Sequence, residues 1–424
     1  MERHPPQSSE IVKTPPSRFT DHMCPECVKL VLSLGFIPSR LLTRQVLQGL
    51  LQAVKGTPEI QFDDESIFYS LIQAVADKGA GGEILLPLTA GMDSRLILGS
   101  LLEIRNGKSI TCFTYGTLDQ PDVLVAQSVC KANGIDHVHV DADRELSGWS
   151  AESLTEVVQR RLRQGLRPSQ ISIFGNPSAW KVFRGFRGTV LTGFLNDVLT
   201  GRADPPNKGT TFHDRVDWFR KRNHPFSWAG IGALDQESLI RNYVPLDLFQ
   251  GSDQFNVDPR VLADLALKQF QRVKPSLDLF PGAAHPFENA SWVSRWMRCP
   301  TNLRHRQVLL RGFAQRAFPH VFPELGDRVT ASKLERLKHD WKKRNGTNAQ
   351  VSLLRLESAS SSFAAWTQRT LDSEALVKIQ EAIAFTADVG RDLERLLREP
   401  NEAGARRRYI SATVVASMDV DSGT

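Results

Sequence analysis

The residues best placed to do chemistry lie in a short turn between two apolar segments. Residues 84–88 form an apolar run that predicts a strand, and Leu96 to Ile104 predicts a helix. Between them the chain reads Thr89-Ala90-Gly91-Met92-Asp93-Ser94. A turn of small residues before a helix points backbone N–H groups and the positive end of the helix dipole at one place, which suits a bound anion. The alternative is an ordinary corner between a strand and a helix.

The side chains of this turn fit a nucleotide triphosphate bound with a divalent metal. Thr89, Ala90 and Gly91 are small enough for their backbone to approach phosphate oxygens closely. We expect Ser94 to cap the helix and to donate its hydroxyl to a phosphate. Asp93 is placed to hold Mg²⁺, which takes oxygen ligands. The turn therefore predicts a site for ATP and Mg²⁺, with helix capping alone as the alternative role for Asp93 and Ser94.

Four segments of the chain resemble the synthetase domain of the asparagine synthetase family, and they follow one another in that family's order. They are residues 89–94, 113–126, 192–201 and 285–319. The first is similar to the SGGxDS pyrophosphate loop of the N-type ATP pyrophosphatases. The third is similar to the family's GEGxDE…GG segment, and the fourth, a weaker match, to its PFLD…LLR…P stretch. The resemblance covers roughly residues 66–330.

The resemblance implies a role for particular residues in these segments. Asp93 and Asp197 are expected to hold Mg²⁺ from opposite sides of the nucleotide. The backbone of Thr114 and Tyr115 is expected to meet the adenine. Gly193, together with Met92 and the rest of the loop, is expected to lie beside the nucleotide.

The chemistry implied by the resemblance is ATP-dependent amide formation. A substrate carboxylate attacks the α-phosphorus of ATP, pyrophosphate leaves, and ammonia or an amine then displaces AMP from the acyl-adenylate. Anchored phosphates and a metal would stabilise the charge that develops. We expect the acid to be a small molecule or a peptide. Since the segment before residue 84 is too short for a glutaminase domain, ammonia or amine is expected to arrive directly or from a separate glutaminase.

The chain departs from the family pattern at several places. Ala90 replaces a glycine of the loop, which narrows the approach to phosphate. Phe194 stands where asparagine-forming members have a glutamate, and a phenyl ring cannot act as a general base. A base is therefore sought elsewhere, and we name His285 and Glu288 as candidate catalytic residues. A buried structural pair of these two side chains is the alternative.

The order of predicted elements favours an α/β fold with a parallel sheet and helices on both faces, as in the adenine nucleotide alpha hydrolase-like folds. Short apolar strands alternate with helices from residue 84 to residue 140. Ligands in such sheets bind beyond the carboxyl ends of the strands. We divide the chain into a disordered tail at 1–22, a helical lead-in at 23–65, the ATP pyrophosphatase domain at 66–330 and a helical C-terminal extension at 331–424.

Composition narrows the classes of function. The 424 residues are 41% hydrophobic and 24% charged, with a net charge of +6. This modest basic excess suits an acidic substrate, and nucleic acid is not the expected partner. Five cysteines in 424 residues form no disulfide framework, and no apolar run reaches bilayer length, so a cytoplasmic protein without a membrane partner is expected.

Two other functions stay open. One is a tRNA-modifying enzyme that shares the nucleotide loop, although such an enzyme would be expected to have a more basic surface and lacks the segment around Asp197. The other is a non-catalytic descendant that binds ATP, or nothing, and serves as a scaffold for a partner. Phe194 and Ala90 favour this second alternative.

Overall fold

The structure is a computed structural model. It describes residues 40–55, 60–79, 81–105, 107–116, 118, 121–141, 186–202, 204–205, 211–223, 256–278, 280 and 282–322. The predicted tail at 1–22, the start of the lead-in at 23–39 and the C-terminal extension at 331–424 lie outside these residues. None of the described helices is long and apolar enough to cross a membrane.

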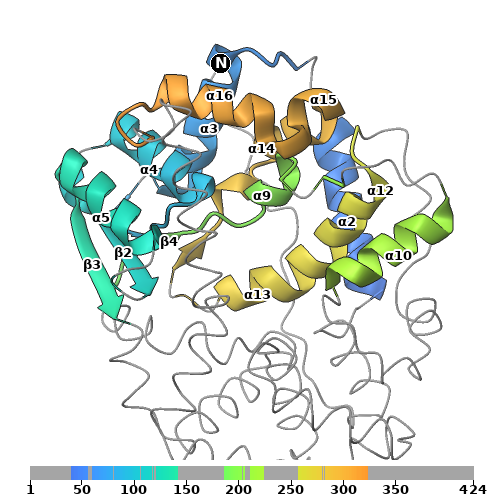
Figure 1. Ribbon diagram of the computed structural model, residues 1–424, viewed down its shortest axis with the longest axis horizontal. Coiled ribbons are helices and arrows are strands. Elements are labelled where there is room, and N and C mark those ends of the chain that lie inside the picture. Colours follow the sequence, from blue (N-terminus) through green and yellow to red (C-terminus); the bar gives the residue numbers. More distant parts are fainter. Residues whose placement is uncertain are drawn as a thin grey trace, which may run out of the picture.

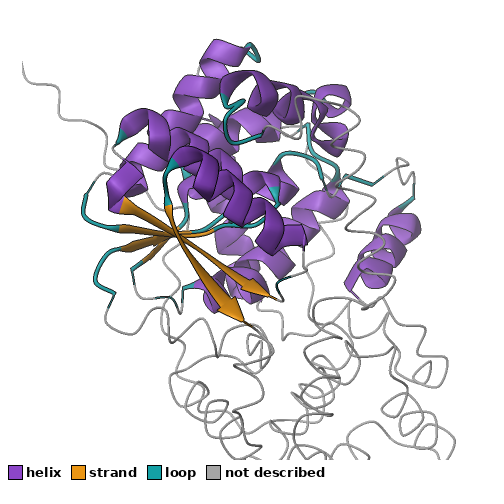
Figure 2. Cartoon of the chain, turned by 60° about the vertical axis from the view of Figure 1, so that its left-hand side comes forward, coloured by secondary structure: helices purple, strands orange, loops and turns teal. Residues whose placement is uncertain are grey.

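The described fold contains a five-stranded sheet that is parallel throughout (Figure 2). The order of its strands is β3-β2-β1-β4-β5. In chain order the strands are β1 (Ile84–Pro87), β2 (Ile110–Gly116), β3 (Asp136–Asp141), β4 (Thr189–Leu191) and β5 (Ala283–Ala284). The predicted parallel α/β sheet is confirmed. β4 ends at Leu191, because the chain turns at 192–195 before a helix begins.

Some of the described helices pack against this sheet, and others form a second group beyond β4 (Figure 1). Those that precede or join the first strands are α2 (Arg40–Lys55), α3 (Asp64–Gly79), α4 (Met92–Ile104), η1 (Gly107–Ser109) and α5 (Pro121–Asn133). Those that follow β4 are α9 (Asn196–Leu199), α10 (Phe212–Asn223), α12 (Pro259–Ala263), the π-helix η5 (Asp264–Val273), α13 (Lys274–Leu277), η6 (Pro286–Glu288), α14 (Ala290–Arg298), α15 (Thr301–Arg304), η7 (His305–Gln307) and α16 (Val308–Ala317).

The two faces of the sheet are covered differently. Alternate residues of a strand point to opposite faces, so Ile84 and Leu86 enter the large core that also holds apolar residues of α3, α4 and α5. Leu85 points the other way, into a smaller cluster with Phe113 and Phe280. The expectation of helices on both faces is therefore met in full on one side, whereas on the other side the described cover consists of single side chains, Leu277 at the end of α13 and Phe280 beyond it.

The carboxyl ends of the parallel strands bring three turns to one edge of the sheet. The loop at 88–91 follows β1, the turn at 192–195 follows β4, and His285 follows β5. β1 pairs with β2 on one side and with β4 on the other. The fold thus places the predicted nucleotide loop beside the segment that carries Asp197.

Candidate functional site

The loop after β1 is closed by its own hydrogen bonds. The Thr89 N–H donates to Ser94 Oγ over 3.2 Å, and the Gly91 N–H donates to Thr89 Oγ1 over 3.0 Å. The Ala90 N–H donates to Asp122 Oδ1 over 3.0 Å. Three N–H groups that were expected to face phosphate therefore have partners within the protein.

Helix α4 begins at Met92, ahead of Ser94, which was predicted to cap it. Its N-cap is Gly91, with no side-chain cap, and Ser94 is already the third helical residue. The expectation that Ser94 caps the helix is wrong, because its hydroxyl is used to close the loop on Thr89. The open first turn of α4 keeps the positive end of its dipole uncapped, directly beside Asp93.

Arg95 fixes the loop after β1 by hydrogen bonds to two of its backbone carbonyl groups. Its Nη2 donates to Ala90 O over 2.8 Å and its Nε donates to Gly91 O over 3.2 Å. The guanidinium lies 4.6 Å from the centre of the Phe322 ring, and burial lowers the pKa of Arg95 to about 10. This cation therefore fixes the carbonyls of the loop.

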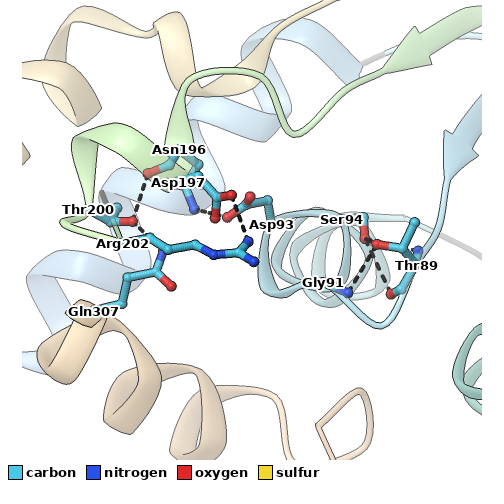
Figure 3. A network of polar contacts seen from close by, with 9 residues as sticks. All are labelled: Thr89, Gly91, Asp93, Ser94, Asn196, Asp197, Thr200, Arg202 and Gln307. Atoms are coloured by element: carbon cyan, nitrogen blue, oxygen red, sulfur yellow. Dashed lines mark hydrogen bonds and ion pairs between the residues drawn. The ribbon is translucent and has the colours of Figure 1, made fainter. Parts of the chain in front are cut away.

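Asp93 and Asp197 lie side by side at the edge of the sheet, with their carboxylates turned toward each other (Figure 3). Asp93 comes from the first turn of α4 and Asp197 from the first turn of α9. Gly193 allows this approach, because a Cβ at Gly193 would lie only 2.8 Å from Asp93 Cβ. The structure thus brings Asp93, Gly193 and Asp197 together.

Asn196 completes the group. It is fully buried, and its Nδ2 donates to Asp93 Oδ1 over 2.6 Å. Its Oδ1 accepts the indole N–H of Trp292 over 3.0 Å. Since an indole nitrogen can only donate, the amide oxygen must face Trp292 and the amide nitrogen must face Asp93.

The charges of the two carboxylates are not fully compensated by the described chain. Burial and the negative charge of Asp197 raise the pKa of Asp93 well above its usual value, while the hydrogen bond from Asn196 works in the opposite direction. Asp197 Oδ2 is paired with Arg202 Nη1 at 2.7 Å. Asp197 Oδ1 is buried without a hydrogen-bond partner in the part of the chain that is described.

These observations fit a hard divalent cation between the two aspartates. A cation would offset the repulsion that raises the pKa of Asp93 and would satisfy the buried oxygen of Asp197. No group of three or more His, Cys, Asp or Glu side chains is gathered at one point among the described residues. Mg²⁺ held by these two carboxylates would therefore need water or phosphate oxygens as its other ligands.

The turn that presents Asp197 is strained. Leu195, the N-cap of α9, has φ 78° and ψ −32°, a backbone conformation that residues other than glycine rarely adopt. The GEGxDE motif has glycine at this place. Thr200 supports the short helix, since its Oγ1 donates to Asn196 O over 2.7 Å and accepts from Gln307 Nε2 over 2.7 Å (Figure 3).

His285 and Glu288 do not pair with each other, so the alternative of a buried His–Glu pair is wrong. His285 Nδ1 lies 2.7 Å from Thr192 Oγ1, and its Nε2 lies 2.7 Å from Asp278 Oδ1. Glu288 instead accepts two hydrogen bonds of 2.8 Å from Lys274 Nζ. The phenyl ring of Phe194 packs against the imidazole of His285, with ring centres 5.2 Å apart.

Thr114 lies near the carboxyl end of β2, and its side chain has a structural role. Its hydroxyl donates to Leu88 O over 2.7 Å and lies 2.9 Å from His137 Nε2. The backbone of Thr114, which was predicted to contact adenine, lies within the stretch of β2 that pairs with β3, opposite His139. Tyr115 belongs to β2, and its side chain lies outside the described part of the structure.

Several residues of the site escaped the sequence analysis. Asn196 occupies the variable position x of the GEGxDE motif, so the motif did not indicate a role for this residue. Arg202, Lys274 and Asp278 come from segments without any motif.

The chain matches no model of a known protein family, and a search of curated proteins gives no match either. The likeness to the asparagine synthetase family therefore stays a prediction made from motifs.

Proposed function

We propose that this protein is an ATP-dependent ligase that adenylates a carboxylate, releases pyrophosphate and passes the acyl group to ammonia or an amine. The observation that carries the proposal is the pairing of Asp93 and Asp197 at the carboxyl edge of a parallel sheet, next to an uncapped helix N-terminus. Open α/β sheets bind their ligands at this edge. A bound cation would stabilise the ionised form of Asp93, whose pKa is raised, and would give the buried oxygen of Asp197 a partner.

Each group of the site has a task in this reaction. Asp93 and Asp197 would hold Mg²⁺, which would neutralise phosphate charge during the release of pyrophosphate. Asn196 would keep Asp93 ionised and aimed at the metal. The first turn of α4 would receive phosphate oxygens on its free N–H groups. Arg95 would hold the loop in the conformation that makes this possible.

The substrates follow from the same chemistry. The acid is a small molecule or a peptide, and the nitrogen comes from ammonia or an amine, supplied directly or by a separate glutaminase. We place the reaction in the cytoplasm. ATP is available there, and the buried free thiols of Cys112 and Cys130 suit a reducing compartment.

The test is exchange of labelled pyrophosphate into ATP, measured with Mg²⁺ across pools of carboxylic acids. We expect exchange that requires both the metal and one pool, and loss of exchange in Asp93→Asn and Asp197→Asn. Asp136→Asn is the matched control, because Asp136 is exposed on β3. A wild-type protein that shows no exchange with any pool would overturn the proposal, whether or not MgATP raises its thermal stability.

One observation favours the second candidate, a non-catalytic descendant. The N–H groups of Thr89, Ala90 and Gly91 are already bonded within the protein, and Arg202 already supplies a positive charge to Asp197. A scaffold of this kind would leave ATP unconsumed with every acid. The exchange experiment separates the two functions, and thermal stabilisation by MgATP without exchange would identify a binding protein without turnover.

A further inference from the structure

Thr192, His285 and Asp278 form a continuous hydrogen-bonded chain of hydroxyl, imidazole and carboxylate. Thr192 Oγ1 lies 2.7 Å from His285 Nδ1, and His285 Nε2 lies 2.7 Å from Asp278 Oδ1. The three residues follow β4, β5 and α13, so separate elements of the fold bring them together. An imidazole between a hydroxyl and a carboxylate is the arrangement that moves protons in acyl transfer.

The available protons settle the order of donors and acceptors. A carboxylate can only accept, so His285 Nε2 carries its proton toward Asp278. In the neutral ring Nδ1 then has a free lone pair, which faces the hydroxyl of Thr192. That hydroxyl donates to Nδ1 and accepts from the Phe194 N–H over 3.4 Å. Asp278 thus holds His285 in the tautomer in which it can take a proton from Thr192.

The chain of groups runs from a buried hydroxyl to an exposed carboxylate. Thr192 and His285 are buried, with exposed fractions of 3% and 4%, whereas the Asp278 side chain is 39% exposed. At the inner end, Thr192 directly precedes Gly193, the residue that packs on Asp93. The Phe194 ring covers the imidazole from the side. A proton accepted by the Thr192 hydroxyl therefore has a hydrogen-bonded route outward through His285 and Asp278.

We propose that Thr192, His285 and Asp278 are the proton relay for the amide-forming half of the reaction; this inference rests on the proposed function. The amine nitrogen forms a bond to the carbonyl carbon of the acyl-adenylate, and the bond from that carbon to the AMP oxygen breaks with its electron pair leaving on AMP. The N–H proton passes to Thr192 Oγ1 while the hydroxyl proton moves to His285 Nδ1. The proton on Nε2 then leaves to solvent through Asp278.

The first arm of the test needs no substrate. Nitrogen NMR of the imidazoles distinguishes a protonated from an unprotonated ring nitrogen, and His285→Gln assigns the signals of this ring. We expect Nε2 protonated and Nδ1 unprotonated, with the Nδ1 signal shifting in Thr192→Val. A ring protonated on Nδ1, or an Nδ1 signal that Thr192→Val leaves unchanged, would overturn the relay.

The second arm separates the two half-reactions, with the acid found by pyrophosphate exchange and with ammonium chloride as the amine source. Thr192→Val should keep exchange within about twofold and reduce amide formation by about 10²-fold or more, as expected for loss of general base catalysis. Thr192→Ser, which keeps the hydroxyl, should recover most of the rate. His213→Ala is the control, because His213 is exposed on α10.

The outcomes tell apart failure of the relay and failure of the proposed function. Equal loss of exchange and amide formation in Thr192→Val would show a structural role and overturn the relay, as would full amide formation in that variant. Absence of exchange in the wild type would overturn the proposed function, and the relay with it. If the wild type shows exchange but either experiment contradicts the relay, the relay is overturned and the proposed function stands.

Discussion

Asn196 donates its side-chain amide to Asp93 Oδ1 over 2.6 Å, and Trp292 fixes which end of that amide faces the carboxylate. All three elements involved, α4, α9 and α14, meet at the carboxyl edge of the sheet (Figure 1). The hydrogen bond from this amide lowers the pKa of Asp93, against the larger effects of burial and of the negative charge of Asp197, which raise it. Asn196 therefore controls how readily Asp93 ionises.

Replacing Asn196 should weaken metal binding most at low pH. Asn196→Ala removes a hydrogen bond that favours the ionised form of Asp93, so the pKa of Asp93 should rise further. Because Mg²⁺ binds the carboxylate, we expect affinity to fall about 10- to 100-fold near pH 7 and less at higher pH. Isothermal titration with Mg²⁺, or Mn²⁺ as its substitute, measures this. Asn302→Ala, an exposed asparagine on α15, is the control and should bind like the wild type.

Asp93→Asn should stabilise the protein in the absence of metal. The pKa of Asp93 is raised in the folded state, so its contribution favours folding at low pH and is lost as the pH rises through the raised value. Above that value the ionised side chain disfavours the folded state, and a neutral amide removes the repulsion from Asp197. We expect the Tm in EDTA to rise by roughly 2–4 °C at alkaline pH, with a gain that shrinks as the pH is lowered.

Calorimetry at several pH values tests this expectation, with Asp136→Asn as the control on an exposed surface. A Tm that falls in Asp93→Asn would mean that Asp93 is not a strained charge in the metal-free protein. The opposing effects on stability and on metal binding would be typical of a functional site.

The sequence predicted the elements that depend on local pattern. The apolar runs that became β1, β2 and β3 are bounded by turn residues, and the helices between them carry apolar residues at helical spacing, so their type and order follow from the chain alone. The two-residue strand β5 was missed, since no periodic pattern can be read over Ala283–Ala284. Its existence depends on pairing with β4, which is a tertiary interaction.

The site was predictable where a motif named its residues and not where partners were chosen by packing. Asp93 and Asp197 were placed together from the two motifs. The partners of His285 and Glu288 were not, because Asp278 and Lys274 approach through the fold of η5 and α13. The role of Ser94 was also wrong, because the start of α4 at Met92 depends on where the loop closes.

Arg202→Gln should strengthen the binding of a divalent cation. The guanidinium pairs with Asp197 Oδ2 at 2.7 Å but is 62% exposed, so the pair contributes little stability and competes with metal for the same oxygen. Loss of an exposed ion pair worth about 0.2–1 kcal/mol corresponds to an affinity gain of about 1.4- to 5-fold. Titration with Mn²⁺ followed by electron paramagnetic resonance measures it, and Arg187→Gln, at an exposed position, is the control. Weaker binding in Arg202→Gln would show that Arg202 helps to build the site.

The buried pair of Lys274 and Glu288 should matter for stability more than the exposed pairs. Both side chains are about as buried as the core, with exposed fractions of 8% and 7%, and they are joined by two hydrogen bonds of 2.8 Å. Lys274→Met leaves the charge of Glu288 buried and alone, which should cost about 3–5 kcal/mol of unfolding free energy. The double variant with Glu288→Gln should lose less than the single one. Urea denaturation decides this, and an equal loss in both variants would mean that the charge of Glu288 finds another partner.

Leu195 offers a test of strain at the turn before Asp197. Its φ of 78° is favourable only for glycine, yet its side chain is buried, so both Leu195→Ala and Leu195→Gly should destabilise the protein. The free energy of unfolding should be about 1 kcal/mol higher for Leu195→Gly than for Leu195→Ala, because glycine removes the backbone strain that alanine keeps. Leu199, in helix α9, is the matched control, and there glycine should be worse than alanine by about 1 kcal/mol. If alanine is preferred at both positions in urea denaturation, the turn at Leu195 does not store strain, and Asp197 is presented by an ordinary helix start.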